Sequence, residues 1–292
     1  MSGAEAITRA LNGTWRGGKG TACCPAHRDR SPSLSLADGA DGRLLLYCHA
    51  GCTFGDIVDA LRRRGLLGRS HGAERPVQVD DARRRLEQRA DAAKRSRMAR
   101  ELWESSQPIE NTLGNVYIRE RGIACALPES LRYIRNCWHK SAKRLPAIVA
   151  RVDGGQGFAV HRTYLTADGR AKANVEAPKV MLGPVGGGAV RLSTEARRLV
   201  VAEGIETALS LQCGVLKEPA SIWAALSAGG MRKLRLPARP GELVIAPDGD
   251  APGREAADAL ALRAQSLGWR VALLPAPDGH DWNDVLCGKA AA

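Results

Sequence analysis

The stretch ELVIAPDGDAPGREAA, residues 242–257, decides the fold. An apolar run over residues 243–246 ends in Pro247, and Asp248 and Asp250 follow with one glycine between them. A short apolar run bounded by turn residues is typical of a buried strand. The two carboxylates directly after it indicate either a polar Asp-Gly turn or a pair of ligands for one cation. The rest of the chain is needed to choose between these two interpretations.

The alternation of strand and helix extends over residues 195–292. Strands are predicted at 197–204, 242–250 and 269–276, and a strand and turn at 221–230. Helices are predicted at 205–214, 231–236 and 253–268, with a helix start at 281–288. Such βαβ units form a parallel sheet with helices on both faces. Ligands bind at the carboxyl ends of the strands in these sheets. This rule places Glu203 at the same edge of the sheet as Asp248 and Asp250, and we call this edge the rim.

The fold class is therefore α/β, and four segments are expected along the chain: residues 1–66, 67–110, 111–194 and 195–292. The first ends in an amphipathic helix near residues 53–67. The second has a linker over 68–80 and a polar helix over 80–106, whose sparse apolar positions predict light packing. The third has a short helix near 115–123, strands at 146–153 and 157–166, and a Gly-rich turn at 183–190.

The charge distribution indicates a polyanionic partner. The chain has 292 residues, 44% of them hydrophobic and 25% charged, which is ordinary for a globular protein. Its net charge is +12, and the positive excess lies in residues 61–194, which hold 26 of the 43 basic residues but 13 of the 31 acidic ones. A concentrated basic block favours nucleic acid as a partner. A solvated basic helix is the alternative.

Four of the eight cysteines lie in the first 52 residues and predict a zinc site. Cys24, His27, Cys48 and Cys52 give C-x2-H, twenty intervening residues, and C-x3-C, with strand-like segments between the two pairs. Four protein ligands leave no open position, so the zinc should be structural. Two other side chains, Cys23 and His49, are rival ligands; the turn at Pro25 favours Cys24. The scattered cysteines, Cys125, Cys137, Cys213 and Cys287, are expected to be buried small hydrophobic residues.

Several motifs of the sequence together resemble those of a known protein family. CCPAHRDRSPSLSL (residues 23–36) and YCHAGC (47–52) resemble the zinc-binding domain of bacterial and phage primases, although three residues separate the second cysteine pair here where two are commoner. VVAEGIETALS (200–210) and VIAPDGDAPGREAA (244–257) resemble a Toprim domain, and GHDWNDVL (279–286) resembles its later acidic motif. Residues 164–192 look like the basic region that precedes Toprim. No Walker A pattern occurs, so the helicase half of many phage primases is not expected in this chain.

The resemblance implies a zinc ribbon, a helical linker, a basic α+β subdomain and a C-terminal Toprim domain with a Rossmann-like parallel sheet. It implies that Asp248 and Asp250 bind Mg²⁺ or Mn²⁺, and that Glu203 joins them or acts as a general acid or base. Further metal ligands are expected at Asp281 and Asp284, and Asn283 is expected to hydrogen-bond nucleotide.

Basic residues of the middle segment are expected to contact the nucleotide triphosphate and the template. The candidates are Arg162, Lys172, Lys179 and Arg191, which lie in the matching region near the Gly-rich turn. Weaker candidates are Arg119, Arg121 and the basic helix. Three tryptophans are also considered for base stacking, with a core role as the alternative: Trp103, Trp138 and Trp282.

Taken together, these patterns predict a DNA primase that makes short primers from NTPs on single-stranded DNA, in the cytoplasm, with a separate replicative helicase as a partner. A Toprim nuclease is the first alternative, disfavoured because none of the four tyrosines has the context of a nucleophile. A non-catalytic protein of a mobile element that binds single-stranded nucleic acid is the second. No apolar run approaches the roughly 18 residues of a membrane span.

Overall fold

The computed structural model describes residues 3–29, 31–39, 42–67, 78–194 and 198–289, with the side chains of 78–84 excepted. The chain forms two compact units, residues 1–82 and 83–292. The predicted linker over 68–80 lies outside the described residues up to residue 77. The division into four segments stays a prediction. None of the helices in the described part of the chain combines the length and apolar character that a membrane crossing requires.

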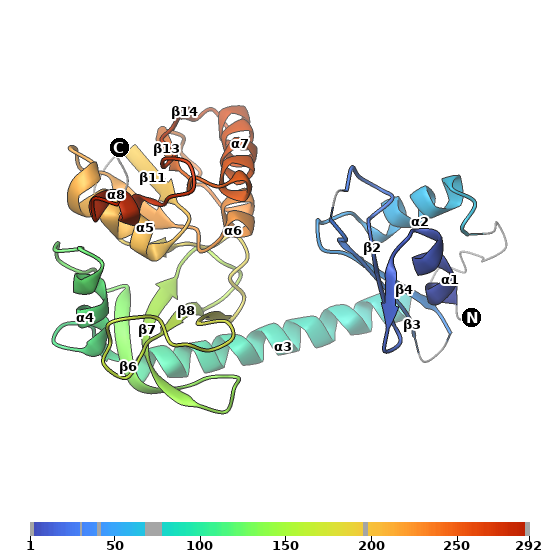
Figure 1. Ribbon diagram of the computed structural model, residues 1–292, viewed down its shortest axis with the longest axis horizontal. Helices are drawn as coiled ribbons and strands as arrows, with labels where there is room; N and C mark the ends of the chain where they lie inside the picture. The colour runs from blue at the N-terminus through green and yellow to red at the C-terminus, as the bar shows by residue number, and fades with distance from the viewer. Residues whose placement is uncertain (1–2, 30, 40–41, 68–77, 195–197, 290–292) are drawn as a thin grey trace. The chain divides into compact units, whose positions relative to one another are not determined.

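The N-terminal unit is a four-stranded antiparallel sheet with two helices (Figure 1). Its elements are α1 (Gly3–Ala10), β1 (Thr14–Arg16), β2 (Lys19–Ala22), β3 (Leu34–Asp38), β4 (Leu44–Cys48) and α2 (Phe54–Arg63), with the strands in sequential order. Thr53 caps α2 and forms a capping box with Asp56. Leu34 and Leu36 of β3 are buried against Ile57 of α2 and other residues of one core. The helix α1 was not predicted from the sequence.

The long helix α3 (Gln78–Glu104) begins five residues before the boundary between the units, and the rest of it forms the start of the second unit. An antiparallel sheet of order β5-β6-β7-β8-β9 follows, with α4 packed against it. The bounds are β5 (Gln107–Pro108), α4 (Leu113–Glu120), β6 (Leu131–Trp138), β7 (Arg144–Val152), β8 (Ala159–Tyr164) and β9 (Lys179–Leu182). Ala99 near the end of α3 is buried in a small cluster with Val149 and Val160. The light packing expected for this helix therefore applies to its exposed turns, not to its C-terminal end.

The C-terminal sheet has the order β10-β12-β11-β13-β14 and is parallel except for β10. Its elements are β10 (Val190–Arg191), β11 (Arg198–Ala202), α5 (Ile205–Ser210), the π-helix η1 (Leu211–Val215), β12 (Ser221–Ala224), α6 (Ala228–Lys233), β13 (Glu242–Ala246), α7 (Ala251–Ser266), β14 (Arg270–Leu273) and α8 (Trp282–Leu286). Helices α5 and α8 lie on one side of this sheet and α6 and α7 on the other (Figure 1). The predicted α/β fold class is confirmed.

Alternate residues of each buried strand enter two different cores. In β11, Val200 and Ala202 join the core that contains α5 and α8, while Leu199 and Val201 join the core that contains α6 and α7. This follows from the period of two along a strand, and it requires an apolar residue at every position when both faces are covered. The first core continues into the antiparallel sheet, for example at Ile148.

The expectation that four scattered cysteines are buried hydrophobic residues holds only for Cys137. Cys125 and Cys213 are half-buried and form a disulfide across 88 residues of sequence, and Cys287 is exposed. The prediction was therefore wrong for these three residues. Their pairing depends on the fold, which brings the segment after α4 beside η1, and no local sequence pattern signals it.

Candidate functional site

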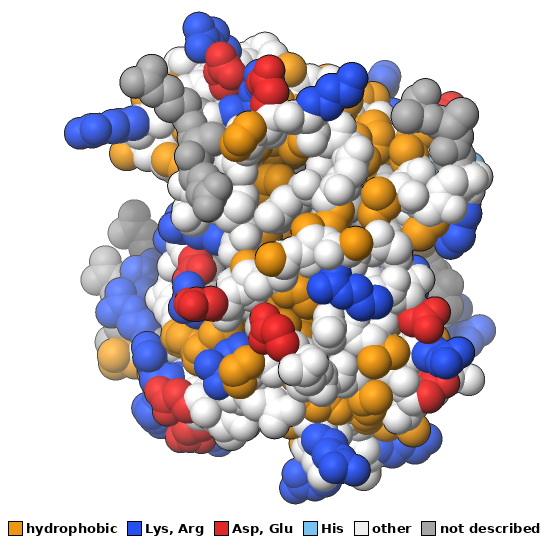
Figure 2. Space-filling view, turned by 90° about the vertical axis from the view of Figure 1, so that its left-hand side faces the viewer, with side chains coloured by type: hydrophobic (Ala, Val, Ile, Leu, Met, Phe, Trp, Pro, Cys, Tyr) orange, Lys and Arg blue, Asp and Glu red, His pale blue; other side chains and the backbone are white. Residues whose placement is uncertain are grey.

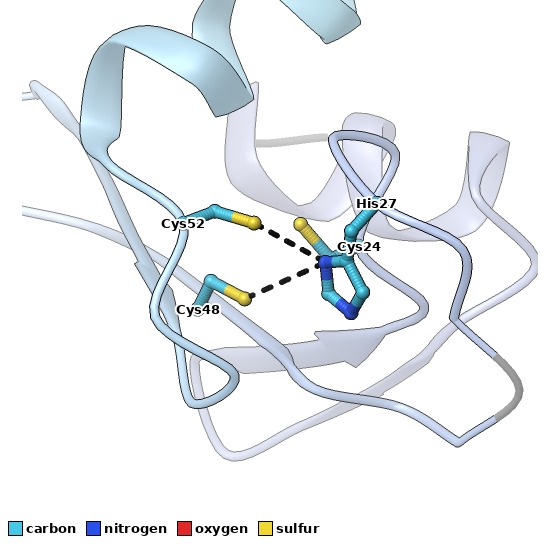
Figure 3. Close-up of side chains that lie close together, drawn as sticks. All are labelled: Cys24, His27, Cys48 and Cys52. Atoms are coloured by element: carbon cyan, nitrogen blue, oxygen red, sulfur yellow. Dashed lines mark hydrogen bonds between the residues drawn. The ribbon is translucent and has the colours of Figure 1, made fainter. Parts of the chain in front are cut away.

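The four predicted zinc ligands converge in the N-terminal unit (Figure 3). Cys24 and His27 lie after β2, Cys48 ends β4, and Cys52 precedes α2. Their ligand atoms all lie within 4.8 Å of one another, and Cys24 and Cys48 are buried. His27 Nδ1 lies 3.2 Å from Cys52 Sγ and 4.0 Å from Cys48 Sγ. Three sulfurs and one nitrogen at such spacings fit a tetrahedral structural zinc ion.

The two rival ligands do not enter this cluster. Cys24, and not its neighbour Cys23, contributes the first sulfur. The Nε2 atom of His49 hydrogen-bonds Ser35 Oγ at 2.9 Å, and its ring stacks edge-on against Tyr47. Burial opposes ionisation of Cys48, but hydrogen bonds from the backbone of Cys52 and from Ser33 lower the pKa of its thiol to about 6. A thiolate is the form that binds zinc.

Asp29 supports the zinc cluster and was not singled out from the sequence. Its carboxylate accepts hydrogen bonds from Ser33 Oγ at 2.5 Å and from the backbone N–H of Cys24 at 2.7 Å, and it lies 3.7 Å from His27 Nε2. The Ser33 and Cys24 bonds lower the pKa of Asp29 to about 2. A carboxylate behind a ligating histidine fixes the ring and its tautomer. The signal in the sequence is an aspartate two residues after the histidine.

The acidic residues of the second unit gather at the carboxyl ends of β11 and β13. These two strands are parallel, with Ala202 opposite Ala246, so the residues that follow them meet at one edge. Glu203 follows β11, and Asp248 and Asp250 follow β13. The backbone of Gly249 hydrogen-bonds the carbonyl of His280, and a Cβ at this position would overlap the carbonyl of Pro277. Glycine at 249 thus lets the segment before α8 approach the rim.

The rim concentrates negative charge. Burial, together with the charges of Glu203, Asp281 and Asp250, raises the pKa of Asp248 to about 7, although a hydrogen bond from Thr207 opposes this rise. Burial and the charge of Asp250 also raise the pKa of Glu203. Carboxylates that disfavour each other's ionisation are stabilised by a shared cation.

A Mg²⁺ or Mn²⁺ ion on the rim would have to be held partly through water. Apart from the zinc cluster, no group of three or more Cys, His, Asp or Glu side chains among the described residues is compact enough to hold an ion directly. Mg²⁺ retains several waters and takes only one or two carboxylates together with substrate phosphates. The role of Glu203, Asp248 and Asp250 as ligands of such an ion stays a prediction.

Two of the predicted metal ligands also begin helices. Asp250 is the N-cap of α7 and accepts the N–H of Gly253 at 2.7 Å, while Asp281 is the N-cap of α8. Asp284 closes a capping box with Asp281 and pairs with Lys289 at 3.4 Å, and these contacts lower its pKa although burial opposes them. The structure therefore turns Asp284 towards its own helix start.

Asn283 lies in the interior. Its side chain is 2% exposed, and Nδ2 donates to the carbonyl of Arg121 at 2.7 Å and to Ser210 Oγ at 3.0 Å. These contacts tie α8 to the end of α4 and to α5, and they occupy the amide that was expected to bind nucleotide. Trp282 is also buried, and its Nε1 donates to the carbonyl of Leu274, which is the core role considered for it.

Lys172 and Lys179 meet at a buried glutamate. Lys172 Nζ lies 3.3 Å from Glu206 Oε1, and Lys179 Nζ lies 3.2 Å from Oε2. Tyr117 donates a hydrogen bond to Oε1 at 2.8 Å. The glutamate side chain is 9% exposed, whereas the two lysine side chains are 31% and 38% exposed. Glu206 was quoted in the strand–helix motif but received no role from the sequence.

The two predicted arginines lie against aromatic rings. The guanidinium of Arg162 is 5.7 Å from the centre of the Tyr164 ring, and that of Arg191 is 4.6 Å from the centre of the Trp223 ring. Their Nε atoms are buried without a hydrogen-bond partner. His161, next to Arg162, has a buried and unpartnered Nδ1, and burial together with the charge of Lys179 lowers its pKa to about 4.

The weaker candidates are dispersed. Arg119 donates to the backbone carbonyls of Ile123 and Cys125, and Arg121 lies over the Tyr117 ring. Trp138 is 55% exposed, whereas the half-buried Trp103 lies under two arginines. On the face shown in Figure 2, Lys and Arg side chains are spread out and do not form one continuous patch.

Comparison with known proteins assigns a class to part of the chain. Residues 198–292 match the model described as "Toprim domain", and residues 93–192 match the "Domain of unknown function (DUF7146)". The C-terminal sheet with its acidic rim is thus a Toprim domain. No curated protein sequence matches the chain significantly.

Among solved structures, the chain is similar to the zinc-binding and RNA polymerase domains of the Aquifex aeolicus primase. The identity is 14% and the TM-score 0.39, over 99% of this chain and 80% of that one. It is also similar to the RNA polymerase domain of Mycobacterium tuberculosis primase DnaG, with 15% identity and a TM-score of 0.36 over 67% of this chain and 77% of that one. The same M. tuberculosis domain has been solved in complex with double-stranded DNA, and that structure has a TM-score of 0.33 and 17% identity over 67% of this chain and 74% of that one.

Proposed function

We propose that the chain is a DNA primase that joins NTPs into short primers on a single-stranded DNA template. The observation that carries this proposal is the acidic rim at the ends of β11 and β13, within electrostatic reach of the Lys179 ammonium. Nucleotidyl transfer needs a cation for the phosphate oxygens and positive charge for the leaving pyrophosphate. A Toprim domain with these two groups of side chains supplies both.

Each group has a distinct role in this proposal. Glu203, Asp248 and Asp250 would hold Mg²⁺, which would neutralise the phosphate oxygens and activate the attacking 3′-hydroxyl. Asp248 gives up its proton when it binds the cation. Asp281 contributes charge to the rim from the start of α8. Lys172 and Lys179 contact the triphosphate, because their side chains are partly exposed and each ammonium group keeps donors that Glu206 does not use.

The N-terminal unit engages the template in this proposal. Structural zinc fixes the turn after β2 and the end of β4, which holds the antiparallel sheet together. Tyr47 and Leu45 on β4 are 64% and 50% exposed, and exposed Lys19 lies on β2 of the same sheet. An exposed aromatic ring suits stacking on unpaired bases. A separate helicase stays a predicted partner.

A Toprim nuclease that forms a tyrosyl intermediate is less well supported. Three of the four tyrosines, Tyr117, Tyr133 and Tyr164, are at most 4% exposed. Burial raises the pKa of each of these hydroxyls, which disfavours nucleophilic attack. The fourth, Tyr47, belongs to the N-terminal unit.

The test is primer synthesis on single-stranded DNA with labelled NTPs and Mg²⁺ or Mn²⁺. We expect Asp248→Asn to abolish extension. Asp258→Asn changes an exposed aspartate of α7 in the same way and should leave extension unchanged. Strand cleavage by the wild-type chain, or binding without extension, would support one of the two alternatives instead. Extension that persists in Asp248→Asn would contradict the role given to the rim.

A further inference from the structure

Glu206 occupies a central position between the two lysines and the rim. It is the second residue of α5, and its two carboxylate oxygens contact one ammonium each, at 3.3 Å and 3.2 Å. The Tyr117 hydroxyl anchors the same carboxylate at 2.8 Å. The lysines come from the segment after β8 and from β9, so a single side chain fixes two separate pieces of the antiparallel sheet.

The carboxylate is ionised although it is buried. Burial opposes its charge, but the ammonium groups of Lys179 and Lys172 hold the pKa of Glu206 well below its usual range. The three groups together carry one net positive charge. A buried charge of this kind is tolerated only with such partners, and its removal leaves two ammonium groups facing each other.

Of the two lysines, Lys179 lies close enough to the rim to interact with its charges. Thr207, the next residue of α5, donates a hydrogen bond to Asp248 at 3.3 Å, so adjacent residues of one helical turn contact the lysine pair and the acidic rim. The negative charge of Asp248 favours the ammonium form of Lys179, and the positive charge of Lys179 favours the ionised form of Glu203. A lysine side chain is long and flexible, so an unrestrained ammonium would pair with these carboxylates.

We infer that Glu206 is a positioning residue that holds Lys179 away from Asp248 and Glu203 and so keeps the rim available to a divalent cation. This inference rests on the proposed function only in taking the rim as the cation site. This role explains why Glu206 pairs with both lysines, although the pairing neutralises one of the two positive charges that the proposed function places near phosphate. Without Glu206, the chain's own ammonium group would compete with the metal.

The test is Mn²⁺ binding to the full chain after zinc loading, measured by electron paramagnetic resonance without nucleotide. We expect Glu206→Gln to weaken Mn²⁺ binding about tenfold, because a unit charge a few ångströms away at the surface has an effect of this size. Glu206→Gln combined with Lys179→Gln should restore binding to within about twofold of wild type, since the competing ammonium is gone. Glu255→Gln, an exposed helix residue paired with Arg232, is the matched control and should bind as wild type.

Two further variants separate positioning from the simple loss of a negative charge. Glu206→Gln with Arg121→Gln removes a positive charge near Tyr117 but leaves both ammonium groups free, so binding should stay weak. Tyr117→Phe keeps every charge and loosens the anchor of Glu206, so binding should weaken about two- to threefold, as the loss of one hydrogen bond allows. Equal rescue by the Arg121 change, or no effect of Tyr117→Phe, would overturn the inference.

The proposed function is tested separately in the same assay. Asp248→Asn should remove the Mn²⁺ signal of the rim. If it does not, the rim is not the cation site and the proposed function fails at that step. If Asp248→Asn removes the signal while Glu206→Gln leaves it unchanged, only the role of Glu206 is lost. Melting temperatures of all variants show whether each one is folded; if Glu206→Gln does not fold, Tyr117→Phe alone decides.

Discussion

The hydroxyl of Thr207 donates a hydrogen bond to a carboxylate oxygen of Asp248 across 3.3 Å. This contact joins the first turn of α5 to the segment that follows β13. This hydrogen bond favours the ionised form of Asp248, whereas burial and the charges of three neighbouring acids favour the protonated form. Asp248 therefore changes its charge near neutral pH, where an ordinary aspartate does not.

Metal binding at the rim should consequently depend on pH. The pKa of Asp248 is about 7, so the carboxylate is protonated below that pH and a cation must displace the proton. We expect the Mn²⁺ affinity of the metal-free rim to fall about tenfold between pH 8 and pH 6. Titration by calorimetry in buffers of different ionisation enthalpy measures both the affinity and the released proton. An affinity that is constant over this range would contradict the assignment.

Capping and metal binding can be separated at Asp250. Asp250→Ala removes both the carboxylate and the cap of α7, and should lower the free energy of unfolding of this unit by about 1 kcal/mol. Asp250→Ser retains an oxygen that caps the helix and should unfold at nearly the wild-type denaturant concentration. Both variants should lose primer synthesis. If Asp250→Ser were active, the carboxylate would serve only to begin the helix.

The zinc assignment predicts different outcomes at two adjacent cysteines. Cys24→Ser should lose stoichiometric zinc and the folded structure of residues 1–82, because three ligands remain and the metal holds the core together. Cys23→Ser should retain zinc. Metal analysis by mass spectrometry, with circular dichroism of each variant, checks both. Loss of zinc in the Cys23 variant alone would reverse the assignment.

The disulfide should stabilise the second unit independently of zinc. Cys125→Ser/Cys213→Ser removes a cross-link over 88 residues, and we expect the free energy of unfolding to fall by about 2–4 kcal/mol. Chemical denaturation of residues 83–292 with and without reductant gives the same comparison in the wild-type chain. Cys137→Ser in the buried core is not an equivalent control, so Cys287→Ser, at an exposed position, serves instead. Equal stability in all three proteins would show that the cross-link constrains nothing.

The sequence predicted the Toprim sheet because β11 to β13 are apolar runs between turn residues, and this pattern is local. It did not predict β6, because a bulge between Ile134 and Cys137 interrupts the alternation of buried and exposed residues. The acidic rim could be predicted because the carboxyl ends of neighbouring parallel strands meet at one edge of the sheet. The pairing of Glu206 with Lys179 could not, since only the packing of the two sheets brings these side chains together. Asn283 differs in the opposite way. Its place in a motif predicted a hydrogen bond to nucleotide, but its side-chain amide donates to neighbouring residues of the fold instead.

The two kinds of sulfur in this chain impose an order on its maturation. Zinc requires three cysteines as thiolates, whereas Cys125 and Cys213 are joined in the oxidised state. In a metal-free chain under oxidising conditions, Cys24, Cys48 and Cys52 lie close enough to compete for disulfide formation among themselves. We therefore expect that zinc bound before oxidation protects these three thiolates.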